Sequence, residues 1–478
     1  MSQDNLHQLD RGQIGLWGVL IPGLAQVAPA FNLFFTTGVM ASLAGASVPL
    51  VFLISGAGVL ATASSLAQFA GVYPSSGSFL TYIARSIGAK TATSVGIITI
   101  LGYIIAFGGI YIFVGSYIVS NLFGNSHIWG ITQIVTILYG VLVTVPVIVG
   151  LKFGVRISYA LYIFEAVLLV VLSIAFLSHG GPQGITSAPF KWPGGSKSTL
   201  LAFSLAILAY GGFEAAAPLA EETRDPRKNV PRAVIGTVVV SGIIYVLGSW
   251  ALVTAFGPSH VGILAADPNP FHTAAAKYIS VLAPLVTWIF LTSVTSSYIA
   301  ANTQTARVIF GGARSGLWSK VLSKVSPRFR TPAYAAVAFV APSIVIAVGS
   351  TAFTNPGTAS GFLGTYGILG LIIMYIVANF ALIVHWVKND RAAGLKRMVT
   401  RLVVPVVGIA ILAIPVWGDL QPGQAAPYKY LPYLTIALIA VGIIYTFVLA
   451  TRRPAIMRDA PGLLEGAELY EARMAGDS

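Results

Sequence analysis

The sequence contains no cysteine and very few charged residues. Because cysteine is absent from all 478 residues, disulfides, thiol nucleophiles and cysteine-ligated metal sites are excluded. Only 9% of the residues are charged, whereas soluble globular domains carry roughly 25%. A soluble multidomain protein is therefore excluded.

Histidine is also scarce and scattered, and the N-terminus lacks an apolar run. No two histidines are spaced for a helical zinc site, so we expect no metal and no cofactor. The first 13 residues are polar and mixed in charge, which predicts that they are not a cleavable signal peptide. The histidines are at positions 7, 127, 179, 260, 272 and 385.

The chain is rich in long apolar runs. Hydrophobic residues make up 56% of it, and its mean hydropathy is +0.82. Because a bilayer core of about 30 Å needs about 20 apolar residues per helix, this pattern predicts a polytopic membrane protein. We expect twelve spans, at 14–40, 47–71, 91–121, 128–150, 155–178, 199–222, 231–256, 278–305, 333–352, 358–386, 401–418 and 431–451.

The basic residues are distributed unevenly across these spans. With the N-terminus placed in the cytoplasm, 24 of the 28 Lys and Arg residues lie on that side, and the other four are Lys191, Lys197, Lys277 and Lys429. This positive-inside bias predicts a multi-pass protein of the cell (inner) membrane with both termini cytoplasmic. The same bias accounts for the net charge of +13, because basic residues beside anionic lipid set the orientation of a membrane protein. We therefore expect no nucleic-acid partner.

Three segments outside the spans have a distinct composition. The segments 73–90 and 307–332 mix apolar and basic residues, which favours short helices at the membrane interface. The tail after Pro454 is polar and acidic, so we expect loose structure there.

The first span carries residues that disfavour an unbroken helix. The sequence GLWGVLIPGLAQVAPAFN (15–32) includes Pro22, Gly23 and Pro29. Proline lacks the N–H that the helical ladder needs, and glycine leaves helical geometry easily. Freed backbone groups are costly in hydrocarbon, so an interrupted helix should line a polar cavity. The alternative is that these residues only kink the helix or allow close packing.

The sixth span has a matching interruption. In AILAYGGFEAAAPLAEET (206–223), Gly211 and Gly212 adjoin each other and Glu214 follows at once. Because this span is five after the first, the two would run in opposite directions across the membrane. Interrupted helices at corresponding positions of inverted halves indicate the midplane binding site of a transporter.

At this point the sequence resembles a known family, the amino acid-polyamine-organocation (APC) superfamily of transporters. The resemblance is carried by YGGFEAAAPLAEETRDPRKNVPRA (210–233), YPSSGSFLTYIARSIG (73–88) and the segment 307–332, and it covers roughly residues 14–450. The chain departs from the family where residues 24–29 replace a Gly-Ser-Gly-Ile segment. It also has Leu169 where some members carry a lysine in a cation site.

The resemblance implies an all-α polytopic protein with the leucine-transporter-like fold. That fold has five helices, five inverted helices and two more. It implies a secondary active transporter, not an enzyme, that moves an amino acid or related amine by alternating access, coupled to protons or working by exchange. The expected regions are a cytoplasmic N-terminus (1–13), a first repeat (14–178), an inverted repeat (199–386), two additional helices (401–451) and a cytoplasmic tail (452–478).

A zwitterionic substrate needs donors for its carboxylate and acceptors or π faces for its ammonium. We expect the backbone N–H groups of Ala28 and Ala30, in the first break, to bind the carboxylate, because Pro29 cannot donate. We expect carbonyls and aromatic faces of the second break to hold the ammonium, with cation–π attraction of about 0.5 to 2 kcal/mol. The predicted substrate-binding residues are Ala25, Gln26, Ala28, Ala30, Leu208, Ala209, Tyr210, Gly211, Gly212 and Phe213, with Tyr103, Phe107 and Tyr366 added from their depth alone.

Two acids and a serine cluster are candidates for coupling. Glu165 lies near mid-depth of the fifth span, where an ionised carboxylate costs roughly 2.5 to 3.5 kcal/mol, and is a candidate proton carrier. Glu214 follows the second break and suits a structural or gating role. Ser293, Ser296 and Ser297 could join carbonyls of the first span around sodium, although serine also serves as ordinary helix-packing glue.

Other functions remain open at this stage. The alternatives in the same class are a sodium-coupled symporter and a polyamine or organic cation transporter. The segment HWVKND places His385 and Asp390 at the spacing of some acyltransferases, which makes a membrane-embedded enzyme a remote alternative. A channel could also use broken helices, but channels need repeated rings of carbonyls or charges.

Overall fold

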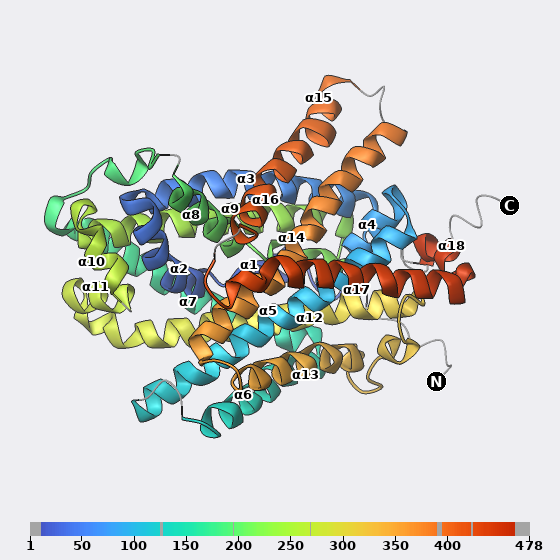
Figure 1. Cartoon of the computed structure of the whole chain (residues 1–478), viewed down its shortest axis with the longest axis horizontal. Helices are drawn as coiled ribbons and strands as arrows, with labels where there is room; N and C mark the ends of the chain where they lie inside the picture. Colours follow the sequence, from blue (N-terminus) through green and yellow to red (C-terminus); the bar gives the residue numbers. More distant parts are fainter. Residues whose placement is uncertain are drawn as a thin grey trace.

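The computed structural model describes residues 11–124, 128–194, 196–267, 269–389, 394–421 and 424–463. Within these ranges the chain is helical, and eleven helical segments are long and apolar enough to cross a membrane. The protein is therefore a multi-pass membrane protein, and its helices form one elongated bundle (Figure 1). The α-helices are α1 Leu16–Val27, α2 Pro29–Ala44, α3 Val48–Val72, α4 Phe79–Ser86, α5 Ala89–Phe123, α6 Ile131–Val149, α7 Leu151–His179, α8 Lys197–Ala209, α9 Pro226–Phe256, α10 Val261–Ala266, α11 Pro270–Tyr278, α12 Ala283–Arg314, α13 Ala333–Ser350, α14 Pro356–Asn389, α15 Leu395–Met398, α16 Val404–Asp419, α17 Leu431–Arg452 and α18 Pro454–Leu463.

Short helices of other types connect or extend these elements. The 3-10 helices are η2 Gly45–Ser47, η3 Gly181–Gln183, η4 Ala188–Phe190, η5 Phe213–Glu222, η6 Pro258–His260, η7 Ser280–Leu282, η8 Lys320–Ser323 and η10 Tyr428–Tyr430, and η9 Val399–Val403 is a π-helix that joins α15 to α16.

The first apolar segment covers two of the predicted spans. It runs from Leu16 to Val72, 57 residues, or about 85 Å of helix at a rise of 1.5 Å per residue. The chain reverses direction inside it at η2, where Gly45 has a φ of 62°, so α3 runs back from the end at which α2 finishes (Figure 1). Each of the other ten segments matches one predicted span. The described residues thus contain eleven apolar helical segments, the first of which covers two predicted spans. The count of twelve spans stays a prediction.

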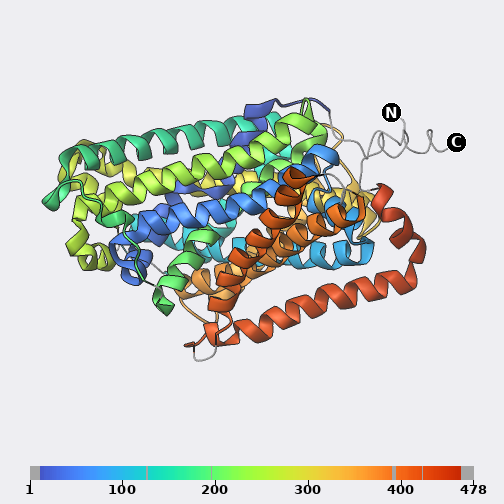
Figure 2. The same ribbon diagram turned by 90° about the horizontal axis from the view of Figure 1, so that it is seen from above.

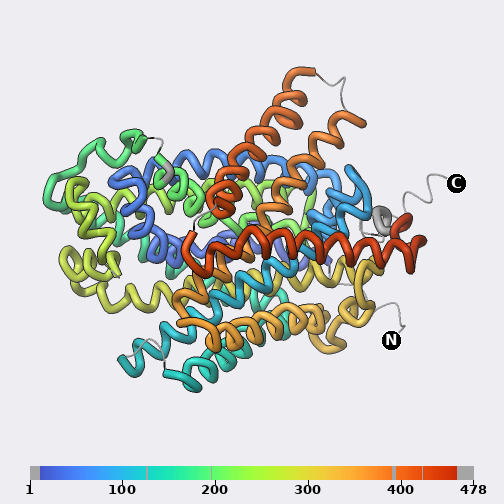
Figure 3. The backbone as a smooth tube through the Cα atoms, in the orientation of Figure 1, coloured from blue at the N-terminus to red at the C-terminus, as the bar shows by residue number. Residues whose placement is uncertain are grey.

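The loops separate into two ends of the bundle. The short helices α10 and α11 lie at one end, whereas α4 and α18 lie at the other, as the tube in Figure 3 also shows. The end with α4 carries Arg85 and Lys90, and the end with α11 carries Lys277. This arrangement agrees with the basic residues gathering at one membrane face.

Helices at the centre and at the edge of the bundle differ in burial. In the segment Ser198–Glu222, 72% of the most apolar stretch is buried, against 22% in Leu395–Asp419 and in Tyr428–Arg452. Helix α17, in the last of the apolar segments, lies along the edge of the bundle (Figure 2). The interrupted sixth span therefore sits in the interior, where its freed backbone groups meet protein and not lipid.

The first span is interrupted at Ala28 and not at Pro22 or Gly23. Helix α1 runs continuously through Pro22, and a Cβ on Gly23 would clash with Thr237 of α9. Of the three residues that disfavour an unbroken helix, Pro29 therefore adjoins the break, whereas Pro22 and Gly23 do not interrupt the helix. A transmembrane helix tolerates a proline where neighbouring groups compensate, and Gly23 allows close helix packing.

Two predictions outside the spans also need correction. Helix α4 is not an interfacial helix, because all of its residues except Arg85 are buried. The start of the tail is not loose, because Pro454–Leu463 forms α18. The rest of the tail lies outside the described residues.

Candidate functional site

The first break is a single left-handed residue between two helices. Ala28 has φ 49° and ψ 65°, and its N–H donates to the Ala25 carbonyl at 3.2 Å. Helix α2 then begins with Pro29, which fixes the chain direction and lacks an N–H. The next N–H, of Ala30, donates to Glu165 Oε1 at 2.6 Å. The two backbone N–H groups predicted to hold a substrate carboxylate thus already donate to protein atoms.

Glu165 and Ser293 together cap the N-terminus of α2. Glu165 projects from α7 and is fully buried. Its Oε1 also accepts from the Ser293 hydroxyl at 2.8 Å, and Ser293 accepts in turn from the Phe31 N–H at 3.1 Å. Because the N-terminus of a helix carries partial positive charge, a carboxylate at this place is electrostatically favourable. Glu165 Oε2 has no hydrogen-bond partner among the described residues.

The second break lies where the two glycines predict it. Helix α8 ends at Ala209, and the 3-10 helix η5 begins at Phe213. Gly212 has a φ of 102°, a left-handed conformation that favours glycine. A Cβ on Gly212 would lie 2.7 Å from the Gln26 Cγ. The two breaks therefore contact each other directly.

Two side chains join the freed carbonyls of both breaks. The Asn32 amide donates to Val27 O at 2.6 Å and to Ala209 O at 3.2 Å. The Tyr245 hydroxyl lies 2.6 Å from Ala209 O and 3.2 Å from Val27 O. Sequence reasoning missed both residues, although a lone asparagine in an apolar span is a usable signal. Their donors satisfy carbonyls that would otherwise be unpaired in the membrane interior.

A second buried acid follows the second break. Glu214 accepts from the hydroxyls of Tyr103 on α5 and Tyr375 on α14, and the Tyr375 bond is 2.6 Å long. The Gln26 amide donates to Tyr103 at 3.3 Å, which connects the first break to this carboxyl. Phe213 stacks on the Tyr375 ring, with centroids 5.1 Å apart. The structure thus brings Gln26, Tyr103, Phe213 and Glu214 together, and adds Tyr375.

Other predicted residues have partners beside this cluster or outside it, and the Phe107 ring centroid lies 6.2 Å from that of Tyr103. Tyr210 donates to the Phe52 carbonyl on α3 at 3.1 Å, and Tyr366 donates to the Leu434 carbonyl on α17 at 3.0 Å. The Phe107 ring packs on Tyr298 and Phe339, and Ala25 lies buried inside α1. The carbonyl of Leu208 is bonded by the Gly211 N–H at 2.9 Å.

The three predicted sodium-binding serines have three different partners. Ser293 faces Glu165, Ser296 bonds back to the Ser293 carbonyl at 2.9 Å within α12, and Ser297 donates to the Gln26 carbonyl at 2.9 Å. Only Ser297 reaches a carbonyl of the first span. Their hydroxyls would have to turn to ligate one ion.

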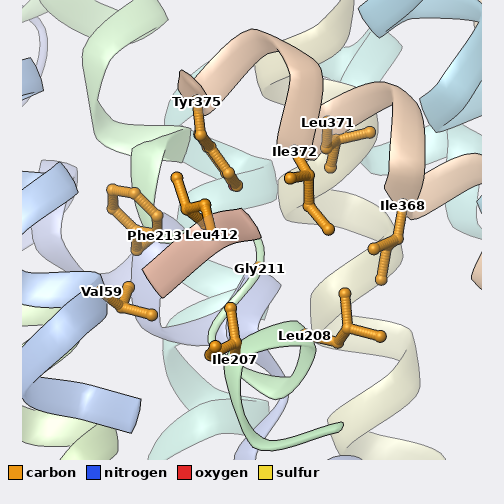
Figure 4. Close-up of a pocket in the computed structure, with 10 residues that line it drawn as sticks. All are labelled: Val59, Ile207, Leu208, Gly211, Phe213, Ile368, Leu371, Ile372, Tyr375 and Leu412. Atoms are coloured by element: carbon orange, nitrogen blue, oxygen red, sulfur yellow. The ribbon is translucent and has the colours of Figure 1, made fainter. Parts of the chain in front are cut away.

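A small apolar cavity adjoins the second break. It offers water-sized molecules about 20 Å³, which is room for about one water. Figure 4 shows Leu208 and Gly211 before the turn and Phe213 after it, facing Ile368, Ile372 and Tyr375 of α14. A substrate of amino acid size therefore requires these side chains or helices to move.

The alternative enzyme site is not assembled in the described residues. His385 lies on α14 beside the rings of Phe69 and Tyr73, and its Nδ1 is 3.2 Å from the amide of Asn389. Asp390 lies outside the described residues. The contacts of His385 are those of an ordinary packed side chain.

Two ion pairs follow Glu214 along the chain, one buried and one partly exposed. Glu222 pairs with Arg307 of α12, and both side chains are almost fully buried. Glu221 pairs with Arg314 at 2.6 Å and accepts from the Ser76 N–H at 3.0 Å. These acids belong to the Glu-Glu-Thr motif of the sequence, whose partners could not be predicted because they lie about 90 residues away.

Comparison with known proteins places this geometry in a family. The family model described as "Amino acid permease" matches residues 18–458. The low-affinity putrescine importer PlaP of Escherichia coli (strain K12) is 24% identical over 91% of this chain and 93% of its own. The branched-chain amino acid permease BcaP of Bacillus subtilis (strain 168) is 25% identical over 89% and 91%. The methylthioribose transporter of the same organism is 25% identical over 56% of each chain. The chain therefore belongs to the amino acid permease family of the APC superfamily, whose members are transporters with the leucine-transporter-like fold and not enzymes.

Proposed function

We propose that the protein moves an amino acid or related amine across the cell membrane by alternating access, with both termini in the cytoplasm. The observation that carries this proposal is the direct contact of two interrupted helices in the bundle interior. Gly212 touches Gln26, and Asn32 and Tyr245 bond carbonyls of both breaks. In membrane transporters such irregular backbone lines the substrate path.

The repeat boundaries expected from the sequence belong to the same proposal. The first repeat spans 14–178, the inverted repeat 199–386, and two further helices occupy 401–451. Substrate would contact the break residues, with Tyr103 and Phe213 beside them. Movement of one repeat against the other would open the site to each side in turn.

For coupling we propose protons or substrate exchange, with Glu165 and Glu214 as the two candidate proton carriers. Both side chains are buried, and each is held only by hydrogen bonds from neutral donors. Sodium coupling is less favoured because the hydroxyls of Ser293, Ser296 and Ser297 point to separate partners.

The first experiment is a thermal-shift screen of the purified protein against the twenty amino acids and common amines. Because a ligand that binds the folded state raises its apparent stability, a hit identifies a substrate. The screen is repeated at several pH values and in sodium or potassium. If no amine or amino acid raises the unfolding temperature under any condition, the proposed function is wrong.

The second experiment separates transport from channel activity and coupling from binding. In proteoliposomes, counterflow of labelled substrate should saturate, whereas a channel gives no acceleration by exchange. Replacing a proton carrier should abolish uphill uptake driven by a pH gradient and leave exchange intact. Replacing a binding residue should abolish both. Glu165→Gln and Glu214→Gln are compared in the two assays, and a variant that keeps pH-driven uptake excludes its residue as the carrier.

A further inference from the structure

We propose that the carboxylate at the N-terminus of α2 is that of Glu165, a residue of the protein itself. The site would therefore bind a substrate amine that carries no carboxylate of its own. This inference rests on the proposed transport function and narrows its substrate class, and of the two candidate proton carriers it leaves Glu214 as the carrier and makes Glu165 a binding residue. It differs from the sequence prediction, in which that helix end binds the carboxylate of an amino acid.

The first turn of α2 has no N–H donor left for a substrate carboxylate. Pro29 has no N–H, Ala30 donates to Glu165, and Phe31 donates to Ser293. The Asn32 N–H makes an ordinary helical bond to Ala28 O at 3.0 Å. A substrate carboxylate would have to displace Glu165, and it would then meet a second negative charge in a region of low dielectric, where like charges repel strongly.

One carboxyl oxygen of Glu165 and a nearby tyrosine hydroxyl lack hydrogen-bond partners among the described residues. Glu165 is 0% exposed, yet its Oε2 has no partner among the described residues. The Tyr162 hydroxyl, one turn earlier on the same face of α7, is also unpartnered, and Tyr162 is 3% exposed. Buried polar atoms without partners are costly. An ammonium has three N–H donors, and these two oxygens are acceptors for it.

The carbonyls of the second break that were expected to bind the substrate ammonium already accept other hydrogen bonds. The Ala209 carbonyl is bonded by Tyr245 and Asn32, and the Leu208 carbonyl by Gly211. The carbonyl of Val27 is likewise taken by Asn32. Two side-chain acceptors beside the breaks are unused among the described residues, Gln26 Oε1 and Glu165 Oε2, and of these only Glu165 Oε2 belongs to an acid.

The test uses pairs of compounds that differ only by the carboxylate: putrescine and ornithine, agmatine and arginine, and 3-methylbutylamine and leucine. Binding is measured by thermal shift and by competition in counterflow. We expect at least one amine to bind about 10-fold or more tightly than its parent amino acid, since a charge-assisted contact is replaced by repulsion.

Variants at Glu165 make the test specific. Glu165→Gln keeps the size of the side chain and removes its charge, so amine affinity should fall about 10-fold or more. Glu165→Ala frees the Ala30 N–H, so the preference for the amine should shrink or reverse. The matched control is Ser173→Ala on the same helix, where the hydroxyl bonds only the Leu169 carbonyl. This control should keep the wild-type preference.

The outcomes that overturn the inference differ from those that overturn the proposed function. If the wild type prefers the amino acid of each pair, or if the preference is the same in wild type and Glu165→Gln, Glu165 is not the substrate's counter-charge, although transport stands. If sodium chloride alone raises the stability and Glu165→Gln abolishes that effect, Oε2 ligates sodium and the inference is wrong. If neither series binds, the proposed function itself fails.

Discussion

The two interrupted helices hold a buried carboxyl group in different ways. At the second break the acid is local, because Glu214 follows Gly212 by two residues and is held by the hydroxyls of two tyrosines. At the first break the acid comes from α7, 135 residues further along the chain, and a backbone N–H holds it. The left-handed residue is glycine at the second break and Ala28 at the first.

This difference separates a fixed carboxyl from an adjustable one. A backbone N–H at a helix end keeps its direction as long as α2 stays folded, so Glu165 is held as long as α2 and α7 keep their relative positions. Tyrosine hydroxyls sit at the ends of side chains on α5 and α14, so Glu214 can lose either one when those helices move. The first break suits a constant binding charge, and the second suits a group whose surroundings change during transport.

The largest effect should come from changing the turn at the second break. Gly212→Ala puts a side chain on a backbone with a φ of 102°. The new Cβ would lie 2.7 Å from the Gln26 Cγ. Left-handed strain and overpacking together predict a loss of roughly 2 to 5 kcal/mol in the free energy of unfolding. It is measured by denaturant titration in detergent, together with counterflow. Gly211→Ala is the control, because Gly211 is not left-handed and its Cβ would meet only Leu208 O at 3.1 Å.

The bridge between the breaks should have the next largest effect. Tyr245→Phe removes the hydroxyl that reaches both Val27 O and Ala209 O, and we expect a loss of about 1 to 3 kcal/mol in unfolding free energy. Tyr298→Phe is the matched control, since that buried hydroxyl reaches only the Phe107 carbonyl, at 3.3 Å. Equal losses in both variants would mean that the bridge has no special role in joining the breaks.

The sequence predicted the fold class and ten of the spans because apolar length and charge bias are local signals. It also predicted the second break, since two adjacent glycines beside an acid have few structural explanations in lipid. It also indicated an interruption in the first span, but Pro22 and Pro29 look equally disruptive in sequence. Only the structure shows that the helix continues through Pro22 and is interrupted at Ala28, next to Pro29.

The candidate site was predicted in part. Gln26, Tyr103, Phe213 and Glu214 come together in the structure. The contact of Glu165 with Ala30 could not be predicted, because nothing in either segment specifies the other across 135 residues. The partners of Ser293, Ser296 and Ser297 could not be predicted for the same reason. The three hydroxyls lie close together on α12, yet each bonds a different partner.

A pair of double-mutant cycles compares the two carboxyls directly. For Glu214→Gln with Tyr375→Phe we expect a coupling energy of about 1 to 2 kcal/mol in unfolding free energy, since the Tyr375 hydroxyl is one of only two side-chain donors to Glu214. For Glu165→Gln with Ser293→Ala the coupling should be smaller, because the Ala30 N–H still donates to Glu165 when Ser293 is removed. Larger coupling at Glu165 would contradict the view of that carboxyl as held by the backbone.

The smallest effect is expected from relieving the left-handed alanine at the first break. Ala28→Gly removes a conformational cost of about 1 to 2 kcal/mol but also loses a buried methyl, worth about 0.8 kcal/mol, so unfolding free energy should stay the same or rise by about 1 kcal/mol. Ala30→Gly, in the first turn of α2, loses the same methyl and adds about 0.5 to 1 kcal/mol of helix destabilisation. The two variants should therefore differ by roughly 2 kcal/mol, with Ala28→Gly the more stable. If they lose equal stability in denaturant titration, Ala28 is not strained in solution, and the first break does not depend on a left-handed residue as the second does on Gly212.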